Sequence, residues 1–408
     1  MSNPINKKRI LIGITGSIAA YKSADLASRL TKLGAEVNAI FTEAGEKFIS
    51  PLSIQSVCGK KAFTEQDLWG CEGNIVHISL AHTADLLVIA PATANTIAKL
   101  ANGIADNLLT VTVLATVCPV IIAPAMDAGM YENTITQRNI NLLKEREYIF
   151  IGPAEGHLAS GLKGPGRMVE PSEIVNKIRY YLSRVNPLNG KKIVVTAGGT
   201  QEAVDPVRIL TNLSSGKQGY AMTQAALDAG SEVTLISAPT SLTPPAGCTL
   251  IPVKSAGEMH AAVLKEIVDA QALIMTAAVA DFRPKNINAE KIKKGVGLKA
   301  IELTSTKDIL KDVAEVKKTE KLDLKVIGFA AESRNLKANA REKLNEKNMD
   351  MIVANDISDP RAGFGVDTNK VLLMYSDGST EQLPMMSKND VADKVIQHLQ
   401  SWLIEGAR

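Results

Sequence analysis

Both halves of this chain open in the same way, and this repeat constrains the fold more than any other feature. Residues Arg9–Ala20 give an apolar run, a small-residue turn and then a helix-like stretch, and Lys192–Thr200 repeats the plan. Where a strand runs into a Gly/Ser/Thr turn ahead of a helix, backbone N–H groups are left free, and these suit a phosphate. The two openings predict two nucleotide-handling domains, which would permit two consecutive reactions on one substrate.

Length and charge set the broad class. A chain of 408 residues suits two domains of ordinary size, and 45% hydrophobic with 22% charged residues is typical of a globular enzyme. The net charge of +3 is too small to favour nucleic acid or a membrane as partner, and no apolar stretch approaches the roughly 20 residues of a membrane span. The polar start and four cysteines without CxxC pairing predict a cytoplasmic protein with reduced thiols.

Each half alternates continuous apolar strands with amphipathic helices, which favours a parallel sheet covered on both faces. We therefore predict an α/β fold with two doubly wound, Rossmann-like domains, the first of them flavodoxin-like, over residues 1–188 and 189–408. A linker is expected at Arg184–Gly190 and a late hairpin at Lys370–Tyr375 with Thr380–Pro384. The predicted parallel strands are Arg9–Ile14, Glu36–Phe41, Ala84–Ala90, Val117–Ala123 and Tyr148–Ile151, then Lys192–Thr196, Glu232–Ser237, Ala272–Thr276, Lys325–Phe329 and Met351–Asn355.

Polar or small residues follow four strands of the first half. In a doubly wound sheet these carboxyl ends meet at one crevice, where ligands bind. Any one of them could be a helix cap, but four in register predict a site for a phosphate and a ring system. The first turn lacks the third glycine of a dinucleotide fingerprint, so NAD is not favoured. The residues concerned are Gly16 and Ser17, Thr42, then Thr93, Ala94 and Asn95, and finally Asp127.

Two further features of the first half have both a structural and a functional interpretation. His77 precedes the third strand; a lone histidine is more often structural, but here it could reach the crevice as a base or orienting group. The glycine-rich segment Gly156–Met168 is either a surface loop or a lid over the substrate.

The second half offers groups that suit an activated carboxylate. Ser214–Lys217 leads into a helix but lacks the GxxxxGK spacing of a P-loop, so a Walker site is rejected. These residues either cap the helix or hold a phosphate or acyl oxygen. Asp281 could contact a nucleotide or a metal. Lys291 lies in a basic run that is either a solvated face or a set of cations near a phosphate. Lys343 and Lys347 share a helix face that meets a triphosphate or simply water.

Over residues 7–180 the chain resembles the cysteine-decarboxylating flavoproteins, specifically the phosphopantothenoylcysteine decarboxylases. The resemblance implies bound FMN at the strand ends named above, and decarboxylation of a C-terminal cysteine amide with His77 as base or orienting group. The motifs that carry it are Thr15–Ala20, the His77 segment, Pro124-Ala125-Met126, Met130 and Gly164–Met168.

Two positions depart from that family's pattern. Asp127 stands where the family usually has an asparagine that contacts the substrate carboxylate; an ionised carboxylate would repel it, so Asp127 must be protonated, re-aimed or assisted by another donor. Ser160 stands where a cysteine usually supplies a proton, and a hydroxyl is a far weaker acid than a thiol of pKa ~8.5.

Over residues 190–400 the chain resembles the phosphopantothenate–cysteine ligases. The resemblance implies that Asn212 holds an acyl-cytidylate and that Lys291 serves the step in which the cysteine amine displaces CMP. Mg²⁺ would accompany CTP, with Asp281 as the candidate residue near it, and CTP rather than ATP is implied by resemblance to the fused bacterial type. The implied CTP-binding residues are Met275, Thr276, Ala277, Asp281, Lys291, Lys307, Asp308, Ile309, Leu310, Phe329, Lys343 and Lys347, although Ser305–Leu310 departs from the usual motif.

The whole chain thus resembles the bifunctional enzymes of coenzyme A biosynthesis, with 4′-phosphopantothenate, cysteine and CTP as small-molecule substrates. The resemblance also implies homo-oligomers, with decarboxylase trimers and ligase dimers. Two alternatives remain open at this point: an active ligase joined to a flavin-binding scaffold that does not decarboxylate, or an NAD-linked oxidoreductase.

Overall fold

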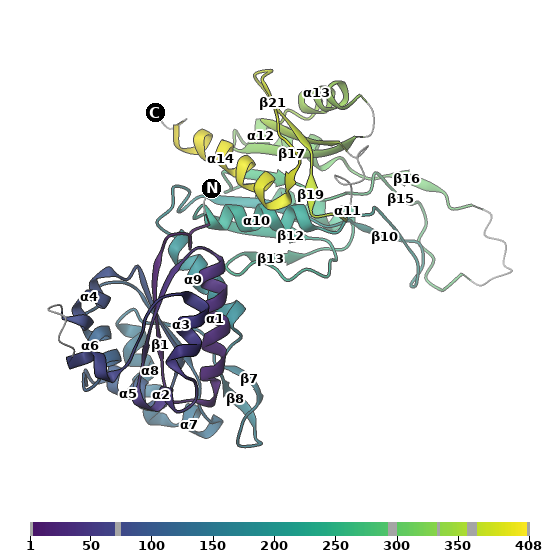
Figure 1. The fold of residues 1–408 in the computed structure, drawn as a ribbon. Coiled ribbons are helices and arrows are strands. Elements are labelled where there is room, and N and C mark those ends of the chain that lie inside the picture. The colour runs from purple at the N-terminus through teal and green to yellow at the C-terminus, as the bar shows by residue number, and fades with distance from the viewer. Residues whose placement is uncertain (1–2, 70–74, 293–299, 333–334, 357–364, 406–408) are drawn as a thin grey trace. The chain divides into compact units, whose positions relative to one another are not determined.

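The computed structural model describes residues 3–69, 75–292, 300–332, 335–356 and 365–405 (Figure 1). The chain divides into two compact units, residues 2–182 and residues 183–408, and each is described here by itself.

The N-terminal unit is built on a six-stranded parallel sheet in the order β3-β2-β1-β4-β5-β6. The order reverses between β1 and β4, and at such a point the strand ends leave a crevice. Without the two-residue edge strand β3, the order is that of a flavodoxin-like sheet, so the predicted doubly wound fold is confirmed. The strands are β1 (Arg9–Ile14), β2 (Glu36–Phe41), β3 (Ala62–Phe63), β4 (Leu86–Ala92), β5 (Val120–Pro124) and β6 (Ile149–Phe150).

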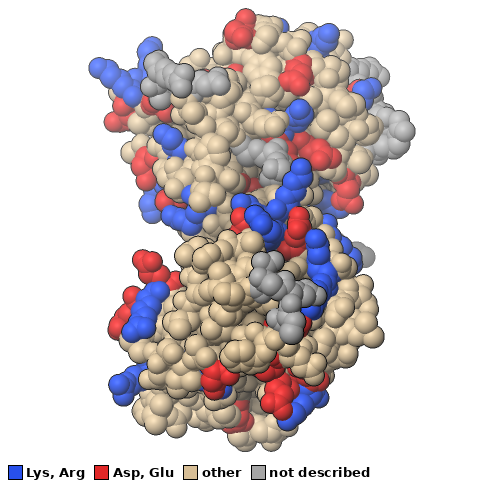
Figure 2. Space-filling model, turned by 60° about the vertical axis from the view of Figure 1, so that its left-hand side comes forward, with Lys and Arg blue, Asp and Glu red and all other residues tan. Residues whose placement is uncertain are grey.

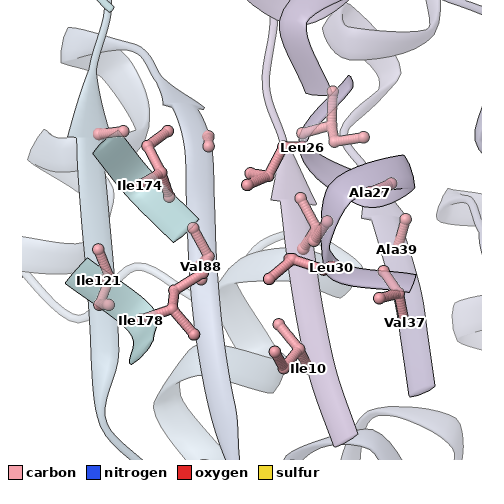
Figure 3. Packing of buried hydrophobic residues seen from close by; sticks show 14 of the residues in the cluster. Ile10, Leu26, Ala27, Leu30, Val37, Ala39, Val88, Ile121, Ile174 and Ile178 are labelled. Atoms are coloured by element: carbon pink, nitrogen blue, oxygen red, sulfur yellow. The ribbon is translucent and has the colours of Figure 1, made fainter. Parts of the chain in front are cut away.

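Helices cover both faces of this sheet. On one face, Leu26 and Leu30 of α1 (Lys22–Lys32) and Ile174 and Ile178 of α9 (Pro171–Ser183) pack against strand residues such as Val88 (Figure 3). Each pair is spaced four residues apart, which places both members on one side of its helix. The other face is covered by α5 (Ala94–Ala101), α6 (Leu108–Ala115) and α8 (Thr134–Glu145).

The C-terminal unit is built on an eight-stranded sheet in the order β13-β12-β9-β14-β17-β18-β20-β21. Its first six strands are parallel and the last two antiparallel, so the predicted hairpin is confirmed. The strands are β9 (Lys192–Ala197), β12 (Glu232–Ser237), β13 (Thr249–Pro252), β14 (Ala272–Met275), β17 (Lys325–Glu332), β18 (Met351–Asp356), β20 (Val371–Tyr375) and β21 (Thr380–Gln382). One face is covered by α10 (Lys217–Asp228) and α14 (Lys388–Glu405), and the other by α11 (Ala256–Glu266), α12 (Ile309–Thr319) and α13 (Leu336–Glu346).

Several short elements lie outside the sequence prediction. The glycine-rich segment forms an antiparallel ribbon, β7 (Ala154–His157) with β8 (Lys163–Arg167), and not an irregular loop. Its sequence has no apolar alternation, so nothing in the pattern indicated pairing. The remaining ribbons are β10 (Gln201–Ala203) with β11 (Ile209–Thr211), β15 (Phe282–Pro284) with β16 (Leu303–Ser305), and β19 (Thr368–Asn369) with β22 (Met386–Ser387). The remaining helices are η1 (Ile18–Tyr21), α2 (Glu43–Glu46), α3 (Pro51–Cys58), η2 (Glu65–Trp69), α4 (Val76–Thr83) and α7 (Ala128–Glu132).

On the face drawn in Figure 2, basic and acidic side chains are intermingled on both units, in keeping with the small net charge. Within the described ranges, no helix has both the length and the apolar character needed to cross a membrane. Cys58, Cys118 and Cys248 are free thiols, and Cys71 lies outside the described residues.

Candidate functional site

A cavity of about 980 Å³ lies in the N-terminal unit, where β1, β2, β4 and β5 end. Its position is the crevice that a doubly wound sheet leaves at the reversal of its strand order. The structure therefore brings together residues that follow four different strands, as well as the tip of the β7–β8 ribbon. Eight predicted site residues line the cavity: Gly16, Ser17, Thr42, Thr93, Ala94, Asn95, Asp127 and Ser160.

Three of these residues also cap helices that begin at the cavity. The hydroxyls of Ser17, Thr42 and Thr93 accept hydrogen bonds at 3.2–3.3 Å from backbone N–H groups in the first turns of η1, α2 and α5. Capping alone would explain each residue singly, but all three helix starts lie on one cavity. The positive ends of their backbone dipoles favour an anion there.

The rest of the cavity fits a flavin. At Gly16 a Cβ atom would lie only 2.5 Å from the Ala44 Cβ, so the first turn packs closely against α2. Apolar side chains, among them Ile18, Met126 and Met130, supply wall for a flat ring. A polar set of helix starts beside an apolar wall matches a group that carries both a phosphate and a ring system.

Two cations in the cavity wall share one carboxylate. The Lys22 ammonium lies 2.9 Å from Glu170 Oε1, and the Arg167 guanidinium lies 2.7 Å from the same oxygen. The hydrogen bond from Lys22, followed by the charges of Lys22 and Arg167, holds the pKa of the Glu170 carboxyl below its usual range. The trio has a net charge of +1, which suits an anionic ligand.

His77 is not among the residues that line this cavity. The expectation that it reaches the crevice of its own chain is therefore not met: it lies on α4, which packs through Leu80 against the sheet face and α6. Its Nδ1 atom is buried and has no hydrogen-bond partner among the described residues.

The two departures from the family pattern are in direct contact. Ser160 Oγ donates a hydrogen bond of 2.6 Å to Asp127 Oδ2, while Asp127 Oδ1 accepts one of 3.0 Å from the Gly129 N–H at the start of α7. Each carboxylate oxygen of Asp127 therefore accepts one hydrogen bond, from Ser160 and from the start of α7.

A smaller cavity of about 160 Å³ lies in the C-terminal unit, at the start of α10 and at the ends of β14, β17 and β18. Of the residues predicted for CTP, Thr276, Ala277 and Phe329 line it. Ser214, Ser215, Gly216 and Lys217 line it as well, so the helix start singled out from the sequence does face a cavity.

Asn212 and Lys291 do not line this cavity, and both lie beside the β10–β11 ribbon. Asn212 follows β11, and its amide donates to the Val279 carbonyl at 3.1 Å. Beside Lys291, the Ile292 N–H donates at 3.3 Å to Asp205, whose side chain is buried between β10 and β11. Lys293 and Lys294 of the predicted basic run lie outside the described residues.

Asp205 fixes the segment next to Lys291 through several hydrogen bonds. It accepts from the backbone N–H of Arg208 at 2.8 Å and from the Arg208 guanidinium at 3.1 Å, and Arg208 in turn donates to the Ile292 carbonyl at 3.2 Å. Burial acts to raise the pKa of Asp205, but the backbone N–H groups and the Arg208 guanidinium hold it below its usual range.

The other residues predicted for CTP do not line the cavity. Lys343 pairs with Glu332 at 2.6 Å, and Lys347 pairs with Asp308, which caps α12, at 3.2 Å. Met275 and Ile309 are buried in the core, so only their backbone groups remain for a ligand, whereas Leu310 is half-buried and Asp281, Lys291 and Lys307 are exposed. Within the ranges described, no group of three or more His, Cys, Asp or Glu residues could hold a metal ion, and for Mg²⁺ bound with a nucleotide one carboxylate can suffice.

Sequence reasoning missed two lysines that line these cavities. Lys22 is only 6% exposed and lies on the buried side of α1. Its spacing of four residues from Leu26 places both on one side of the helix, so the sequence alone could have indicated that Lys22 is buried. Lys388 at the start of α14 is buried beside Lys217, and burial followed by that neighbouring charge lowers its pKa. No local pattern marks Lys388, because it reaches the cavity from the far end of the sequence.

These features define a two-domain α/β enzyme in which a flavin-type cavity and a second strand-end cavity occupy separate doubly wound units. The flavoprotein family model matches residues 1–183, and that of the DNA/pantothenate metabolism flavoprotein C-terminal domain matches residues 188–403. The chain belongs to the family of coenzyme A biosynthesis bifunctional proteins, and it is an enzyme with a decarboxylase and a ligase activity.

Named relatives match the chain over nearly its whole length. The coenzyme A biosynthesis bifunctional protein CoaBC of Bacillus subtilis (strain 168) is 46% identical over 398 residues, which cover 97% of each chain. That of Escherichia coli (strain K12) is 42% identical over 385 residues, covering 93% of this chain and 94% of the relative. A solved structure titled as the C-terminal domain of such a protein is 41% identical, covers 53% of this chain and 98% of its own, and has a TM-score of 0.46. Nothing in the fold or these similarities supports a scaffold or an NAD-linked oxidoreductase.

Proposed function

We propose that the C-terminal unit joins 4′-phosphopantothenate to cysteine through an acyl-cytidylate, using CTP and Mg²⁺, and that the N-terminal unit decarboxylates the product to 4′-phosphopantetheine with FMN. The observation that carries the proposal is the meeting of eight predicted residues around one 980 Å³ cavity, in a chain whose relatives carry the bifunctional name and match 97% of its length. The order of reactions follows from the chemistry, since the ligase product is the decarboxylase substrate.

In the N-terminal unit, bound FMN would supply reversible two-electron oxidation of the cysteinyl group. The hydroxyls and N–H groups at Ser17, Thr42 and Thr93 would hold its phosphate, and Gly16, Ala94 and Asn95 would complete the binding surface. The Lys22–Glu170–Arg167 trio, with its excess positive charge, would attract the anionic substrate.

In the C-terminal unit, Asn212 would orient the acyl-cytidylate, and Lys291 would serve the attack of the cysteine amine. At the start of α10, Lys217 pairs with Asp367 at 2.7 Å, and Lys388 beside them leaves a surplus of one positive charge that would suit a phosphorylated substrate. For CTP, Lys343 and Lys347 would exchange their carboxylate partners for phosphate oxygens, with Mg²⁺ near Asp281. The other residues of the CTP set keep the roles that the resemblance implies.

We also infer that the chain is a homo-oligomer in the cytoplasm, with decarboxylase trimers and ligase dimers. His77 lies outside its own cavity, so a catalytic role for it requires the cavity of another copy. Exposed apolar side chains on and beside the packed helices α4 and α6 support an interface there: Ile75, Ile78, Leu114 and Val117.

One assay tests both reactions. Protein is incubated with 4′-phosphopantothenate, cysteine, CTP and Mg²⁺, and CMP, the cysteine adduct and CO₂ are followed separately. CMP and CO₂ are expected in equal amounts at completion, and the adduct should appear only transiently because the decarboxylase consumes it. Folded protein that releases no CMP would contradict the ligase assignment, and adduct without CO₂ from flavin-loaded protein would contradict the decarboxylase assignment.

A further inference from the structure

The β7–β8 ribbon is attached to the body of the N-terminal unit at its base. The Met126 N–H donates a hydrogen bond of 3.0 Å to the Gly166 carbonyl, and a Cβ at Gly166 would collide with the Met126 carbonyl. Near the middle, a Cβ at Gly164 would lie 3.0 Å from the Ala128 Cβ. Glycines therefore let β8 lie directly against the loop that joins β5 to α7.

The tip of the ribbon has a different attachment. Residues 158–162 form a turn closed by their own backbone, through Leu158 N–H to Leu162 O and Gly161 N–H to Leu158 O, both at 2.9 Å. Its side chains from position 159 onward are exposed. Among the described residues, the side-chain hydrogen bond that joins this tip to the body is the 2.6 Å bond from Ser160 to Asp127.

We propose that Asp127 and Ser160 act as one positioning pair, which fixes the ribbon tip at the cavity and turns the Asp127 carboxylate away from the bound substrate. The inference rests on the proposed function only in taking the decarboxylase substrate as the ligand of the cavity. Both residues line that cavity, so the position of the tip decides the shape of its wall.

The geometry favours such a pair. A hydroxyl that donates to an ionised oxygen makes a stronger bond than one between neutral groups, and 2.6 Å is the distance expected for it. Asp127 is already ordered because its other oxygen caps α7 at Gly129. Little additional freedom is lost when Ser160 binds, since a serine side chain has one rotatable heavy-atom bond.

The pair also changes the roles expected at both positions. Ser160 has a single hydroxyl proton, and that proton is directed to Asp127, so Ser160 does not present it to the substrate. Asp127, as an acceptor at both oxygens, does not bind the substrate carboxylate. That carboxylate is left to the cations of the wall, Arg167 and Lys22.

The first test follows the ribbon itself, in flavin-free full-length protein. Trypsin cleavage after Lys163 is timed in the wild type, S160A, D127N and the double variant. S160A should speed cleavage about tenfold, since a bond to a charged acceptor is worth about that factor. D127N, which keeps the helix cap, should speed cleavage less, and the double variant should match S160A. S160T keeps the hydroxyl and should restore wild-type resistance, and L162A serves as the exposed-tip control.

Additive effects of the two substitutions, or unchanged cleavage in S160A, would overturn the pair. Because this measurement uses no flavin and no reaction, it stands even if the proposed function fails.

The second test separates positioning from proton donation. With flavin-loaded protein and purified cysteine adduct, S160A should raise KM about tenfold and lower kcat by a smaller factor, with S160T close to wild type. A fall in kcat at constant KM would show instead that Ser160 delivers a proton. Absence of CO₂ release from the wild type would refute the decarboxylase assignment and leave the cleavage result as the test of the pair.

Discussion

The Lys22 ammonium contacts the Glu170 carboxylate at 2.9 Å, which joins the first helix of the N-terminal unit to the residue just before its last helix. The two residues are 148 positions apart, and Arg167 approaches the same oxygen from the ribbon. Lys22 is almost fully buried, whereas Glu170 is half exposed. The contact therefore belongs both to the packing of α1 and α9 and to the charge of the cavity wall.

Lys22→Met should weaken both flavin binding and the fold by measurable amounts. Methionine fills the buried space and Glu170 keeps Arg167, but the buried Met168 carbonyl loses its 3.1 Å hydrogen bond from Lys22, so the free energy of unfolding should fall by about 2 kcal/mol. The net charge of the trio falls from +1 to zero, so the flavin Kd should rise about fivefold. Urea unfolding and flavin fluorescence titration measure the two effects. Lys32→Met on the exposed end of α1 is the control, and an equal change in Kd there would contradict a local effect.

The same pair makes stability depend on pH in a defined direction. The pKa of Glu170 is lowered in the folded protein, so its stabilisation is complete above the unfolded value of about 4.3 and is lost as pH falls through the lower folded value. The difference in unfolding free energy between wild type and Lys22→Met should therefore be constant above about pH 5 and should shrink below about pH 4. A difference that grows on acidification would rule out this linkage.

Much of the architecture could be predicted because its signals are local. The strands Arg9–Ile14, Glu36–Phe41 and Glu232–Ser237 occur as predicted, since a buried parallel strand is a short continuous apolar run between helices. The strand β13 was missed because its four residues are mostly exposed at a sheet edge. The β7–β8 ribbon was missed as a strand pair because glycine and proline hide the alternation of sides.

The site could be predicted only as far as it follows strand ends. Residues such as Thr42 and Thr93 stand directly after strands, so topology alone brings them together. The contact of Asp127 with Ser160 depends on how a ribbon folds back, and Lys388 reaches its cavity from another part of the chain. Such long-range contacts leave no local pattern in a single sequence.

Asp205→Asn should impair the ligase through the segment that carries Lys291. The substitution removes the charge that pairs with Arg208 and places a donor where the Ile292 N–H now finds an acceptor. We expect a loss of about 2 kcal/mol in unfolding free energy, together with slower amide formation. Urea unfolding and CMP release measure the two. Lys285→Ala, in the exposed pair with Glu302, should change stability by less than about 0.5 kcal/mol; a similar loss there would argue against a specific role of Asp205.

Lys291→Ala should separate the two ligase steps. In the proposed mechanism the acyl-cytidylate would form from CTP and 4′-phosphopantothenate without this side chain, whereas the displacement of CMP by cysteine would need it. Pyrophosphate release in the first turnover should therefore persist, while the cysteine adduct falls by at least about 100-fold, the lower range for loss of a group acting in proton transfer. Lys285→Ala again serves as the exposed control. An unchanged overall rate would remove Lys291 from the mechanism.

His77→Asn should retain flavin and abolish CO₂ release. Mixed oligomers of two variants should then show whether His77 acts in the cavity of its own chain or of a neighbouring copy. Ala94 lines the cavity at the start of α5, so Ala94→Phe fills space that the flavin requires and should yield colourless, inactive protein. Because His77 lies outside the cavity of its own chain, co-refolded His77→Asn and Ala94→Phe chains should recover part of the wild-type CO₂ release. Each chain refolded alone should stay inactive. Full activity of His77→Asn by itself would exclude His77 from the reaction, and absence of recovery in mixed oligomers of confirmed composition would exclude its action on a neighbouring copy.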